Sequence, residues 1–587
     1  MTPQEVAQSL REIAQLLQLK GENTFKVRAY DSAAETFEAM PADPSVAGGL
    51  LARIKTGTLH ELPSIGKAIE QKVTELVTTG QLAYLHELRS GFPSGILDLV
   101  RVPGVGPKRV LALIAELDIG SLADLRAACE AGRVRGIKGF GAKSEATILE
   151  GVTKLQEMTA RRPLWQTRPV AEALLARIQA ARGVHAAAIA GSIRRFSETT
   201  GDVDLVVELR PGADSAAAMD ALATAPDVGG IIGRGETKLS VRLTNPRGLQ
   251  VDLRVVAAGK FATALHHFTG SKAHHIKLRG LARQRGLTLS EYALASVESG
   301  RALEVHDEAA LYAHLGLPFI APELREDRGE IEAAQANALP SLITEEAVLG
   351  LVHCHTTWSD GENSIEEMAQ AAHALGKRYL TITDHAYASG EGRGLTVERL
   401  RAQTDEIARV QSGFPHLRIL RGVEVDILES GELALPDEEL AALDLVIASV
   451  HQRYHLDAAA QTERIARALA HPLVDIWGHP TGRLLGERAE IDVDLEKLLT
   501  VAARHGVAVE CNGTPRRLDL AAPWLQRANA LGCQIALSVD AHAAGEFANL
   551  RWAVGNARRG WVDRKQVINA LPLDEMLARL HGSRAHR

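Results

Sequence analysis

A strand with two carboxylates on one side constrains this chain more than any other short segment. Residues 202–208, Asp-Val-Asp-Leu-Val-Val-Glu, begin with polar and apolar residues in alternation, which is typical of a half-buried β-strand. Asp202 and Asp204 should share one face of it. A second apolar strand, residues 250–256, carries Asp252 on its polar face. Three such carboxylates predict a site for two divalent cations roughly 3.5–4 Å apart, and hard oxygen ligands favour Mg²⁺ or Mn²⁺.

An isolated Asp-x-Asp pair is more often a solvated strand edge than a metal site. Here a glycine-serine turn and an arginine pair precede the strand, and Val-Asp-Leu-Arg follows at residues 251–254. Together these segments resemble the nucleotidyltransferase palm of the family X DNA polymerases in residue type and spacing. The resemblance implies that Asp202, Asp204 and Asp252 catalyse nucleotidyl transfer. It also implies a nucleotide-binding segment that comprises Gly191, Ser192, Arg194, Arg195 and Gly201. Within it, Ser192 and Arg195 would hold the triphosphate of an incoming deoxynucleotide, and Arg194 and Gly201 would support the loop.

A second family X motif lies at residues 261–272, Phe-Ala-Thr-Ala-Leu-His-His-Phe-Thr-Gly-Ser-Lys. His267 and His275 stand where better-known animal members have a tyrosine and an asparagine. These two differences bear on sugar discrimination and on contacts in the minor groove, not on nucleotidyl transfer. The resemblance assigns four further residues to the nucleotide pocket: Phe268, Gly270, Ser271 and Arg279.

Residues 1–90 have the amphipathic pattern of a small helical domain. Apolar residues recur at helical spacing between residues 6 and 17, and Lys20-Gly21 ends that run. Residues 62–72 resemble the first helix-hairpin-helix of the family X polymerases, in which backbone N–H groups at a helix start hold a DNA phosphate. Lys72 matches the lysine that forms a Schiff base with a 5′-deoxyribose phosphate in gap-filling members. A solvated helix lysine is the simpler interpretation, because a nucleophilic lysine needs a lowered pKa.

Two further segments repeat the hairpin pattern within residues 91–160. Residues 102–109 and 137–144 each place Gly-x-Gly before a basic residue at a helix start. A single Gly-x-Gly is a common turn. Three related hairpins form an internal repeat, which predicts DNA binding that is independent of sequence and weakened by salt. The expected DNA contacts are Ile65, Gly66, Gly104, Val105, Gly106, Lys108, Gly139, Gly141 and Lys143.

Composition agrees with a multidomain enzyme of the cytoplasm. The 587 residues suffice for several domains, each with its own core. We find no apolar run that could span a membrane and no signal-peptide pattern, and the four cysteines are scattered. Residues 1–300 hold 37 lysines and arginines against 31 acidic residues, whereas residues 301–587 hold 29 against 42. The basic half fits phosphate contact, and the acidic half fits multivalent cations.

Residues 347–587 alternate apolar strands with helices, which predicts repeated β/α units and an α/β barrel. A potential metal ligand stands at the end of one strand after another, from His353-Cys-His355 to Asp540-Ala-His542. Ligands at the carboxyl ends of barrel strands belong to the catalytic face. One such histidine would more often be ordinary surface or core, but that explanation does not account for an ordered series.

The series resembles the polymerase-and-histidinol-phosphatase (PHP) domain, whose trinuclear site has histidine and carboxylate ligands. Imidazole-rich ligation favours Mn²⁺, Zn²⁺ or Fe²⁺ over Mg²⁺, and two to three such ions would activate water against a phosphoester. Arg516 and Arg517 resemble flanking residues that could hold substrate phosphate. Matching residue by residue gives nine ligands: His353, His355, Asp360, His385, Glu424, His451, His479, Asp540 and His542.

Hairpin domains, palm and PHP domain follow one another in the order found in bacterial family X DNA polymerases. We therefore expect a multidomain α+β and α/β chain with helical helix-hairpin-helix domains, a nucleotidyltransferase palm and a distorted (β/α)7 barrel. The expected domains are an N-terminal helical domain at residues 1–90, a helix-hairpin-helix domain at 91–160, the palm at 161–317, a linker at 318–346 and the PHP domain at 347–587.

The resemblance implies a DNA polymerase that fills short gaps in base excision repair, with a Mn-dependent 3′→5′ exonuclease in the PHP domain. Its partners would be gapped or nicked DNA, primer 3′ ends and deoxynucleoside triphosphates. We expect a monomer in the bacterial cytoplasm, associated with the nucleoid. Three alternatives stay open: a chiefly exonucleolytic or end-processing enzyme with weak polymerisation, a fused small-molecule phosphomonoesterase, and a non-catalytic scaffold for DNA ends.

Overall fold

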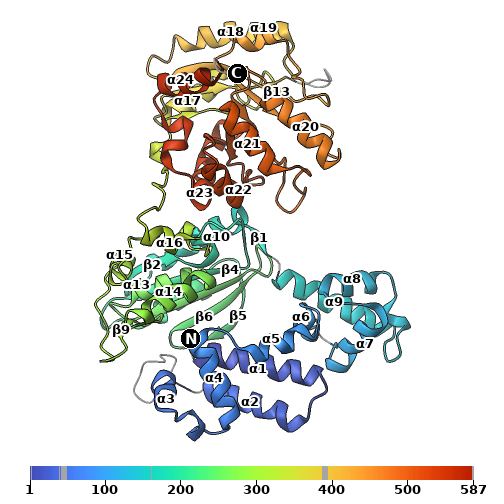
Figure 1. Ribbon diagram of the computed structural model, residues 1–587, viewed down its shortest axis with the longest axis vertical. Coiled ribbons are helices and arrows are strands. Elements are labelled where there is room, and N and C mark those ends of the chain that lie inside the picture. The colour runs from blue at the N-terminus through green and yellow to red at the C-terminus, as the bar shows by residue number, and fades with distance from the viewer. Residues whose placement is uncertain are drawn as a thin grey trace. The chain divides into compact units, whose positions relative to one another are not determined.

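Two sheets of different construction organise the chain, a mixed sheet in the middle of the sequence and a parallel sheet towards its end (Figure 1). The computed structural model describes residues 1, 3–38, 40, 49–102, 104–159, 161–386 and 394–584. Two compact units emerge. The N-terminal unit comprises Met1–Arg162, Val170–Gly191 and Gly201–Phe319, and the C-terminal unit comprises Pro163–Pro169, Ser192–Thr200 and Ile320–Arg587. No described helix is long and apolar enough to cross a membrane.

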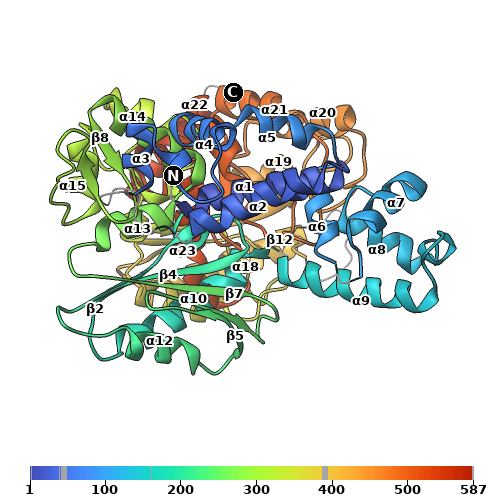
Figure 2. The same ribbon diagram turned by 90° about the horizontal axis from the view of Figure 1, so that it is seen from below.

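The first part of the N-terminal unit has helices and no strand among its described residues. The helices are α1 (Pro3–Leu19), α2 (Thr24–Glu38), α3 (Leu50–Thr56), α4 (Lys67–Thr79), α5 (Ala83–Ser90), α6 (Ile96–Val100), α7 (Pro107–Leu117), α8 (Leu122–Glu130) and α9 (Ala142–Thr159), with 3-10 turns η1 (Leu59–Glu61) and η2 (Val134–Gly136). Helical spacing of apolar residues buries one face of α1, where Leu10, Ile13 and Leu17 are all 0% exposed. α1 and α2 lie side by side (Figure 2).

The three helix-hairpin-helix turns share one backbone geometry. In each turn a residue with left-handed backbone precedes the helix: Ser64 (φ 63°), Gly104 (φ 81°) and Gly139 (φ 91°). The amide of the next residue donates to the carbonyl three residues earlier, at 3.2, 2.9 and 3.0 Å respectively. α4 and α7 begin directly after Gly66 and Gly106, with no side chain capping their first amides. The repeat in the sequence is thus a repeat in structure.

The mixed sheet of the N-terminal unit carries the three predicted palm aspartates on two neighbouring strands. Its strands are β2 (Val184–Ile189), β4 (Asp202–Leu209), β5 (Val228–Arg234), β6 (Lys238–Leu243) and β7 (Gln250–Val256), in the order β2-β4-β7-β6-β5. β4 and β7 run parallel, in a register that pairs Asp204 with Asp252. Alternation along β4 buries Val203 and Leu205 completely and leaves Asp202 and Asp204 half-buried, as the pattern predicts.

Short helices and strands complete the middle of the chain. They are β1 (Arg162–Pro163), α10 (Leu164–Gln179), α11 (Gly191–Arg194), β3 (Thr199–Thr200), α12 (Ala216–Ala223), α13 (Phe261–Thr269), α14 (Lys272–Gln284), β8 (Leu287–Leu289), β9 (Leu294–Ser296) and α15 (Glu308–His314). The linker that follows is ordered into η3 (Pro322–Leu324), α16 (Glu330–Gln335) and η4 (Glu345–Ala347). These linker elements belong to the C-terminal unit.

The C-terminal unit is built on a nearly closed parallel barrel. Its path is β10 (Gly350–Leu351), β11 (Tyr379–Ile382), β13 (Arg418–Asp426), β14 (Leu445–Ser449), β15 (Ile476–Trp477), β16 (Ala508–Asn512) and β17 (Ile535–Ser538), and β12 (His385–Ala386) also pairs with β13. A parallel bridge between Cys354 and Ala541 links the two ends of this path.

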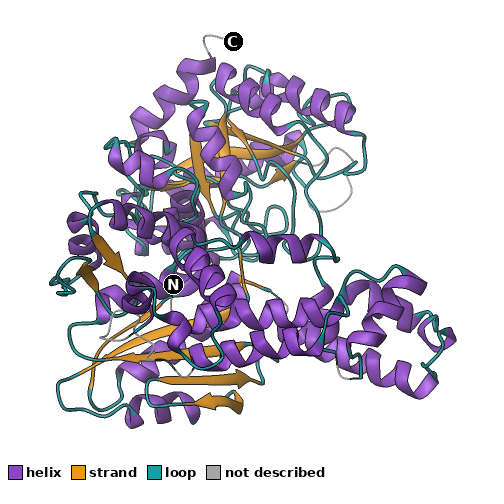
Figure 3. Cartoon of the chain, turned by 60° about the horizontal axis from the view of Figure 1, so that its bottom comes forward, coloured by secondary structure: helices purple, strands orange, loops and turns teal. Residues whose placement is uncertain are grey.

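Helices cover the outside of the barrel strands (Figure 3). They are α17 (Ile365–Ala374), α18 (Val397–Gln411), α19 (Asp437–Ala441), α20 (Ala458–Leu469), α21 (Leu495–His505), α22 (Ala522–Ala530), α23 (Leu550–Arg559) and α24 (Leu573–Arg584), with 3-10 turns η5 (Ala544–Asn549), η6 (Arg564–Gln566) and η7 (Ile568–Ala570). Helix-hairpin-helix domains, a mixed sheet and a near-closed barrel confirm the predicted fold class.

The side chain of Asn569 joins the first and last strands of the barrel. It accepts a hydrogen bond from the amide of Leu537 in β17 (3.0 Å). It donates to the carbonyls of Leu537 (2.7 Å) and of Gly350 in β10 (2.9 Å). Asn569 is fully buried, so a side chain without polar atoms would leave these backbone groups without a partner.

We expect Asn569→Leu to lower the free energy of unfolding of the C-terminal unit by about 3 kcal/mol, because it leaves buried polar groups unpaired. All six tryptophans of the chain lie in that unit, so urea denaturation followed by tryptophan fluorescence measures it. Glu575→Leu, at an exposed position of α24, is the control and should change stability by less than about 0.5 kcal/mol. Equal stability of both variants would contradict this role of Asn569.

Candidate metal centres and nucleic-acid contacts

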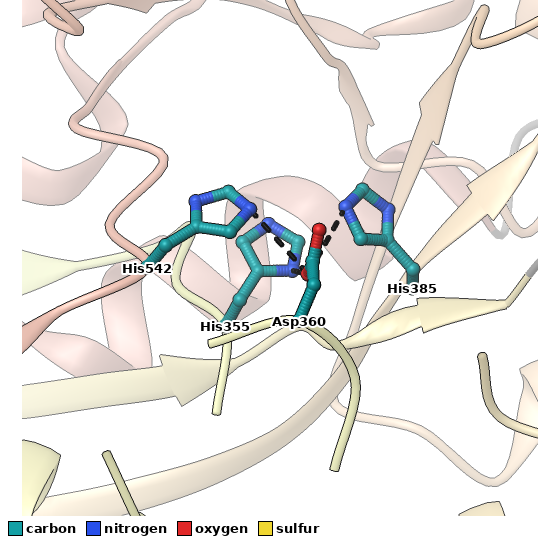
Figure 4. Close-up of side chains that lie close together, drawn as sticks. All are labelled: His355, Asp360, His385 and His542. Atoms are coloured by element: carbon teal, nitrogen blue, oxygen red, sulfur yellow. Dashed lines mark ion pairs between the residues drawn. The ribbon is translucent and has the colours of Figure 1, made fainter. Parts of the chain in front are cut away.

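The carboxyl ends of the barrel strands bring the predicted C-terminal ligands together, as parallel strands do. His451 follows β14 and Asp540 follows β17, while Glu424 lies within β13. In the described part of the chain, ligand atoms gather within 4.8 Å of one another in three groups: His355, Asp360, His385 and His542; His353, His355, Glu424 and Asp540; and His385, Glu424 and His451. In the first group, the rings of His385 and His542 point towards Asp360 (Figure 4).

Shared residues connect these three groups into one centre. His355, His385 and Glu424 each belong to two groups, which is how bridging ligands are arranged in a multinuclear site. Eight of the nine predicted ligands occur in the groups. The ninth, His479, is buried with its Nε2 2.9 Å from an oxygen of Glu424.

Buried polar atoms without a partner show that this donor set fits divalent cations. Nε2 of His353, Nδ1 of His355 and Oε2 of Glu424 are buried and make no hydrogen bond of normal geometry, although imidazole nitrogens lie 2.9–3.5 Å from this carboxylate oxygen. Such atoms are costly unless something binds them. A nitrogen- and oxygen-rich set of this kind fits two to three cations.

Two buried carboxylates orient the histidine ligands from behind. Oε1 of Glu510 lies 2.5 Å from Nδ1 of His353, and Oδ1 of Asp426 lies 2.7 Å from Nδ1 of His451. Both contacts leave Nε2 of the ring for the centre, where it lies 3.4 Å and 3.3 Å from Glu424. A carboxylate behind a ligating histidine fixes its tautomer and raises its basicity.

The sequence analysis gave no role to Asp426 or Glu510. A signal for Asp426 was present, because it stands two residues after Glu424 on the same strand and therefore on the same face. Glu510 stands in β16, which carries no predicted ligand and lies between β15 and β17, the strands that precede His479 and Asp540. Its contact with His353 spans 157 residues of chain.

Charge at the centre shifts the pKa values of its groups strongly. Burial alone would lower the pKa of His451, but Glu424 and Asp426 raise it to about 10. Burial is likewise outweighed at His542, whose pKa is raised to about 9 by its hydrogen bond to Asp360 and by the charge of Asp540.

One of the two flanking arginines faces the centre. Nε of Arg517 lies 3.7 Å from Oδ2 of Asp540, and its NH1 atom is buried without a hydrogen-bond partner. Arg516 is instead paired with Glu487 at the surface, where both side chains are about half exposed. Arg517, and not Arg516, is therefore in a position to contact an anion at the centre.

The three palm aspartates lie on the adjacent strands β4 and β7, and their carboxylate oxygens are farther apart than the ligand atoms of the barrel. Asp252 accepts from the side chain of Gln250 (3.1 Å) and lies 3.5 Å from Nζ of Lys238. Gly191, with φ 61°, passes so close to Asp204 that an added Cβ would lie 2.2 Å from its Oδ2. Among the described residues, the oxygens of the three aspartates do not form a group within 4.8 Å.

The residues expected to bind the nucleotide are divided between the two units. Ser192, Arg194 and Arg195 belong to the C-terminal unit, where Nε of Arg195 lies 2.9 Å from Oε1 of Glu326. Gly201 directly precedes β4 in the N-terminal unit.

Of the other four, Phe268, Gly270 and Ser271 lie where α13 ends and α14 begins in the N-terminal unit, and Arg279 lies within α14. Gly270 has φ 68°, and the hydroxyl of Ser271 accepts from an amide in the first turn of α14. The ring of Phe268 lies 5.1 Å from the guanidinium carbon of Arg254. Burial, together with a neighbouring arginine, lowers the pKa of Arg279 to about 10.

The hairpin residues expected to bind DNA lie at the turns described above. Ile65 and Val105 are buried beneath their turns, at 4% and 1% exposure, and the glycines at 66, 104, 106, 139 and 141 have no protein atom within 3.4 Å of an added Cβ. Lys108 and Lys143 are in the first turns of α7 and α9. At α4 and α7 no side chain caps the first amides, and with the open space at the glycines these helix starts could accept a phosphate.

Lys72 lies on α4 beside an aromatic cluster. Its Nζ lies 4.9 Å from the centre of the Tyr84 ring, and Nζ of Lys26 lies 5.9 Å from the same centre. Tyr30 stacks on Tyr84 with ring centres 6.4 Å apart. The lysine predicted to form the Schiff base and Lys26 thus both lie within 6 Å of the same tyrosine ring.

We expect the apparent Kd of the C-terminal centre for Mn²⁺ to fall as pH rises from about 6 to about 9, by about tenfold per pH unit for each proton displaced. His451 and His542 carry protons below their raised pKa values of about 10 and about 9, so a cation must displace them. Calorimetric titration in two buffers of different ionisation enthalpy counts the released protons. The His451→Gln variant should release one proton fewer on binding Mn²⁺. A Kd for Mn²⁺ that does not change with pH would contradict the role of His451 and His542 as ligands.

Comparison with known protein families finds helix-hairpin-helix domains and a PHP domain where the structure has its hairpins and its barrel. Family models match at four places: a helix-hairpin-helix domain at residues 1–82, a SAM-like helix-hairpin-helix tandem at 96–154, the DNA polymerase beta thumb at 264–326 and a PHP domain at 352–514. A probable phosphatase of Thermoanaerobacter sp. (strain X514) is 29% identical over 232 residues, which cover 37% of this chain and 88% of the relative.

A further relative matches the whole chain. The DNA polymerase/3′-5′ exonuclease PolX of Bacillus subtilis (strain 168) is 36% identical over 578 residues, which cover 98% of this chain and 99% of the relative. The matched domains occur in the same order as the hairpins, palm and barrel described above. The chain belongs to the family X DNA polymerases that carry a C-terminal PHP domain.

Proposed function

We propose that this protein is a DNA polymerase that fills short gaps during base excision repair and shortens DNA 3′ ends with its PHP domain. The observation that carries the proposal is the match to a polymerase/exonuclease over 98% of the chain. Two separate sets of metal-ligand residues support it, one in each unit. The proposed enzyme has the five segments predicted from the sequence, at residues 1–90, 91–160, 161–317, 318–346 and 347–587, and is monomeric, cytoplasmic and associated with the nucleoid.

In the palm, Asp202, Asp204 and Asp252 would hold Mg²⁺ or Mn²⁺. Such cations activate the primer 3′-hydroxyl and neutralise the departing pyrophosphate in nucleotidyl transfer. The primer oxygen attacks the α-phosphorus of the deoxynucleotide in line with the leaving group. The triphosphate-binding residues hold the deoxynucleotide for this attack, and Phe268 with Gly270 and Ser271 contacts its sugar.

In the barrel, the nine predicted ligands would hold two to three Mn²⁺, Zn²⁺ or Fe²⁺ ions. When bound, such ions would supply an activated water and a Lewis acid for the phosphoester. Glu510 and Asp426 orient two of the histidines from behind, and Arg517 binds an oxygen of the scissile phosphate. Attack of water at the terminal phosphodiester releases a nucleoside monophosphate and leaves a new 3′-hydroxyl.

The three hairpins would hold the DNA through its phosphates, without regard to base sequence. This suits a repair enzyme, which must bind gapped or nicked DNA wherever the damage lies. Lys72 is proposed as the nucleophile that removes a 5′-deoxyribose phosphate, since Lys26 beside the shared Tyr84 ring adds a second positive charge. That step would prepare the gap that the palm then fills.

A labelled primer on a short-gap DNA tests both activities, with Mn²⁺ and with or without deoxynucleotides. Asp202→Ala/Asp204→Ala should reduce extension by at least about a thousandfold and leave shortening intact, because only the palm loses its cation ligands. His353→Ala/His355→Ala should have the opposite effect. Each double variant is the control for the other.

One observation favours a second candidate function, an enzyme that is chiefly a 3′→5′ exonuclease or end-processing phosphatase. The barrel ligands are already gathered into close groups, whereas the palm aspartates, within the described residues, are not. If the wild type shortens the primer even with deoxynucleotides present, and the palm variant behaves identically, this second function is the correct one. Activity on free phosphate esters but not on DNA would instead identify a small-molecule phosphatase.

Arg517→Ala should reduce primer shortening about tenfold to a hundredfold, since a hydrogen bond to a charged phosphate contributes about 1.5–3 kcal/mol. Arg516→Ala removes the same charge from the neighbouring position and should leave the rate within about twofold, because Arg516 is paired with Glu487 away from the centre. Initial rates on single-stranded DNA at saturating Mn²⁺ measure both. Equal losses in the two variants would contradict a specific role of Arg517.

A further inference from the structure

The short segment Ser192–Thr200 belongs to the C-terminal unit, although its sequence neighbours Gly191 and Gly201 belong to the N-terminal unit. We call it the triphosphate loop, because it carries Ser192 and Arg195, to which the proposed function assigns the phosphates of the deoxynucleotide. The contacts that hold this loop within the C-terminal unit come from four different places in the sequence. None of them was singled out by the sequence analysis.

An ion-pair network holds Arg195 by both its side chain and its backbone. Nε of Arg195 lies 2.9 Å from Oε1 of Glu326, and the side chains are only 15% and 17% exposed. NH1 of Arg559 lies 2.6 Å from the same carboxylate oxygen. Arg559 also donates to the carbonyl of Arg195 (3.0 Å). One carboxylate and one guanidinium therefore fix the position of this arginine.

The next residue of the loop is inserted between side chains of the same unit. Phe196 is 7% exposed and has left-handed backbone, with φ 59°. Its ring centre lies 5.6 Å from that of Trp552, and the guanidinium of Arg168 lies 5.1 Å from it on another side. Gly555 makes the space, since a Cβ at that position would lie 2.1 Å from the Phe196 ring.

A second buried ion pair holds the far end of the loop. NH2 of Arg483 lies 2.6 Å from Oε1 of Glu198, with Arg483 8% exposed. The carbonyl of Glu198 accepts from the amide of Leu164 (2.8 Å). The loop is thus held at Arg195, at Phe196 and at Glu198, which leaves little freedom for the residues between them.

We propose that Glu326 and Arg559 are positioning residues for nucleotidyl transfer, and that they act by fixing Arg195 and the triphosphate loop. This inference rests on the proposed function of the palm. It makes deoxynucleotide binding depend on residues of the C-terminal unit that take no part in its own metal centre. Burial by itself would raise the pKa of Glu326, but the charges and hydrogen bonds of Arg559 and Arg195 outweigh it and hold the pKa below its ordinary value, so the carboxylate is ionised.

The test uses the full-length enzyme and a matched pair of variants. Glu326→Ala removes the carboxylate beside Arg195. Glu323→Ala is the control. Glu323, in η3, forms an ion pair with Arg558 of α23 (2.8 Å, 15% and 24% exposed), and this pair is about as buried as that of Glu326 with Arg559. Single-nucleotide insertion on gapped DNA gives KM and kcat for the deoxynucleotide, and primer shortening without deoxynucleotides is measured on the same samples.

We expect Glu326→Ala to raise KM for the deoxynucleotide about tenfold to a hundredfold, since misplacement of a positioning group by about 1 Å can have an effect of that order. The control should stay within about twofold, and shortening should be unchanged in both. Arg195→Ala and Arg195→Ala/Glu326→Ala should have the same KM, because Glu326 acts through Arg195. Glu326→Gln, which keeps the shape, should lie between wild type and Glu326→Ala.

Three results would overturn the inference: an unchanged KM in Glu326→Ala, an equal rise in Glu323→Ala, or additive effects in the double variant. Loss of shortening in parallel with extension would also overturn it, because that result indicates general damage to the unit. Failure of the proposed function is distinguishable, since in that case Asp204→Ala leaves extension unchanged. Tryptophan fluorescence during urea denaturation shows whether each variant is folded.

Discussion

Glu424 is the residue on which the C-terminal centre depends. Its carboxylate is 0% exposed, and nitrogen atoms of five histidines lie within 3.5 Å of it: His353, His355, His385, His451 and His479. Burial would raise its pKa, but the imidazoles hold it well below the ordinary value. A buried charge is costly unless it is paired and hydrogen-bonded. Cations at this centre would therefore stabilise the barrel as well as supply chemistry.

The two sets of predicted metal ligands differ in burial and in how closely their atoms gather. In the barrel, imidazoles and carboxylates that are mostly buried meet at one rim, and Glu510 and Asp426 support two of the histidines from behind. In the palm, Asp202 and Asp204 are half-buried on one face of β4. Mg²⁺ keeps waters and substrate phosphates among its ligands, so the proposed palm site would be completed by its substrate. The barrel brings its ligands together before any substrate binds.

Much of the fold could be predicted because its signals are local. Alternation at Asp202–Asp204 predicted a strand with carboxylates on one face, and the strand has that arrangement. Repeated Gly-x-Gly turns predicted three hairpins, and the three share one backbone geometry. Strands alternating with helices predicted the barrel. The order of ligands along the chain was sufficient to expect them at one rim, since every strand of a parallel barrel ends on the same side.

What the sequence by itself determined is the identity and local setting of each group: which residues stand on a strand face, at a helix start or at a strand end. Only the tertiary structure decided which distant groups meet. Glu510 lies behind His353, Arg517 and not Arg516 faces the centre, and Arg195 is held by Glu326 from 131 residues away. The physical reason is that periodicity and turn chemistry act over a few residues. Contacts between remote side chains depend instead on how whole elements pack, and no short pattern records that.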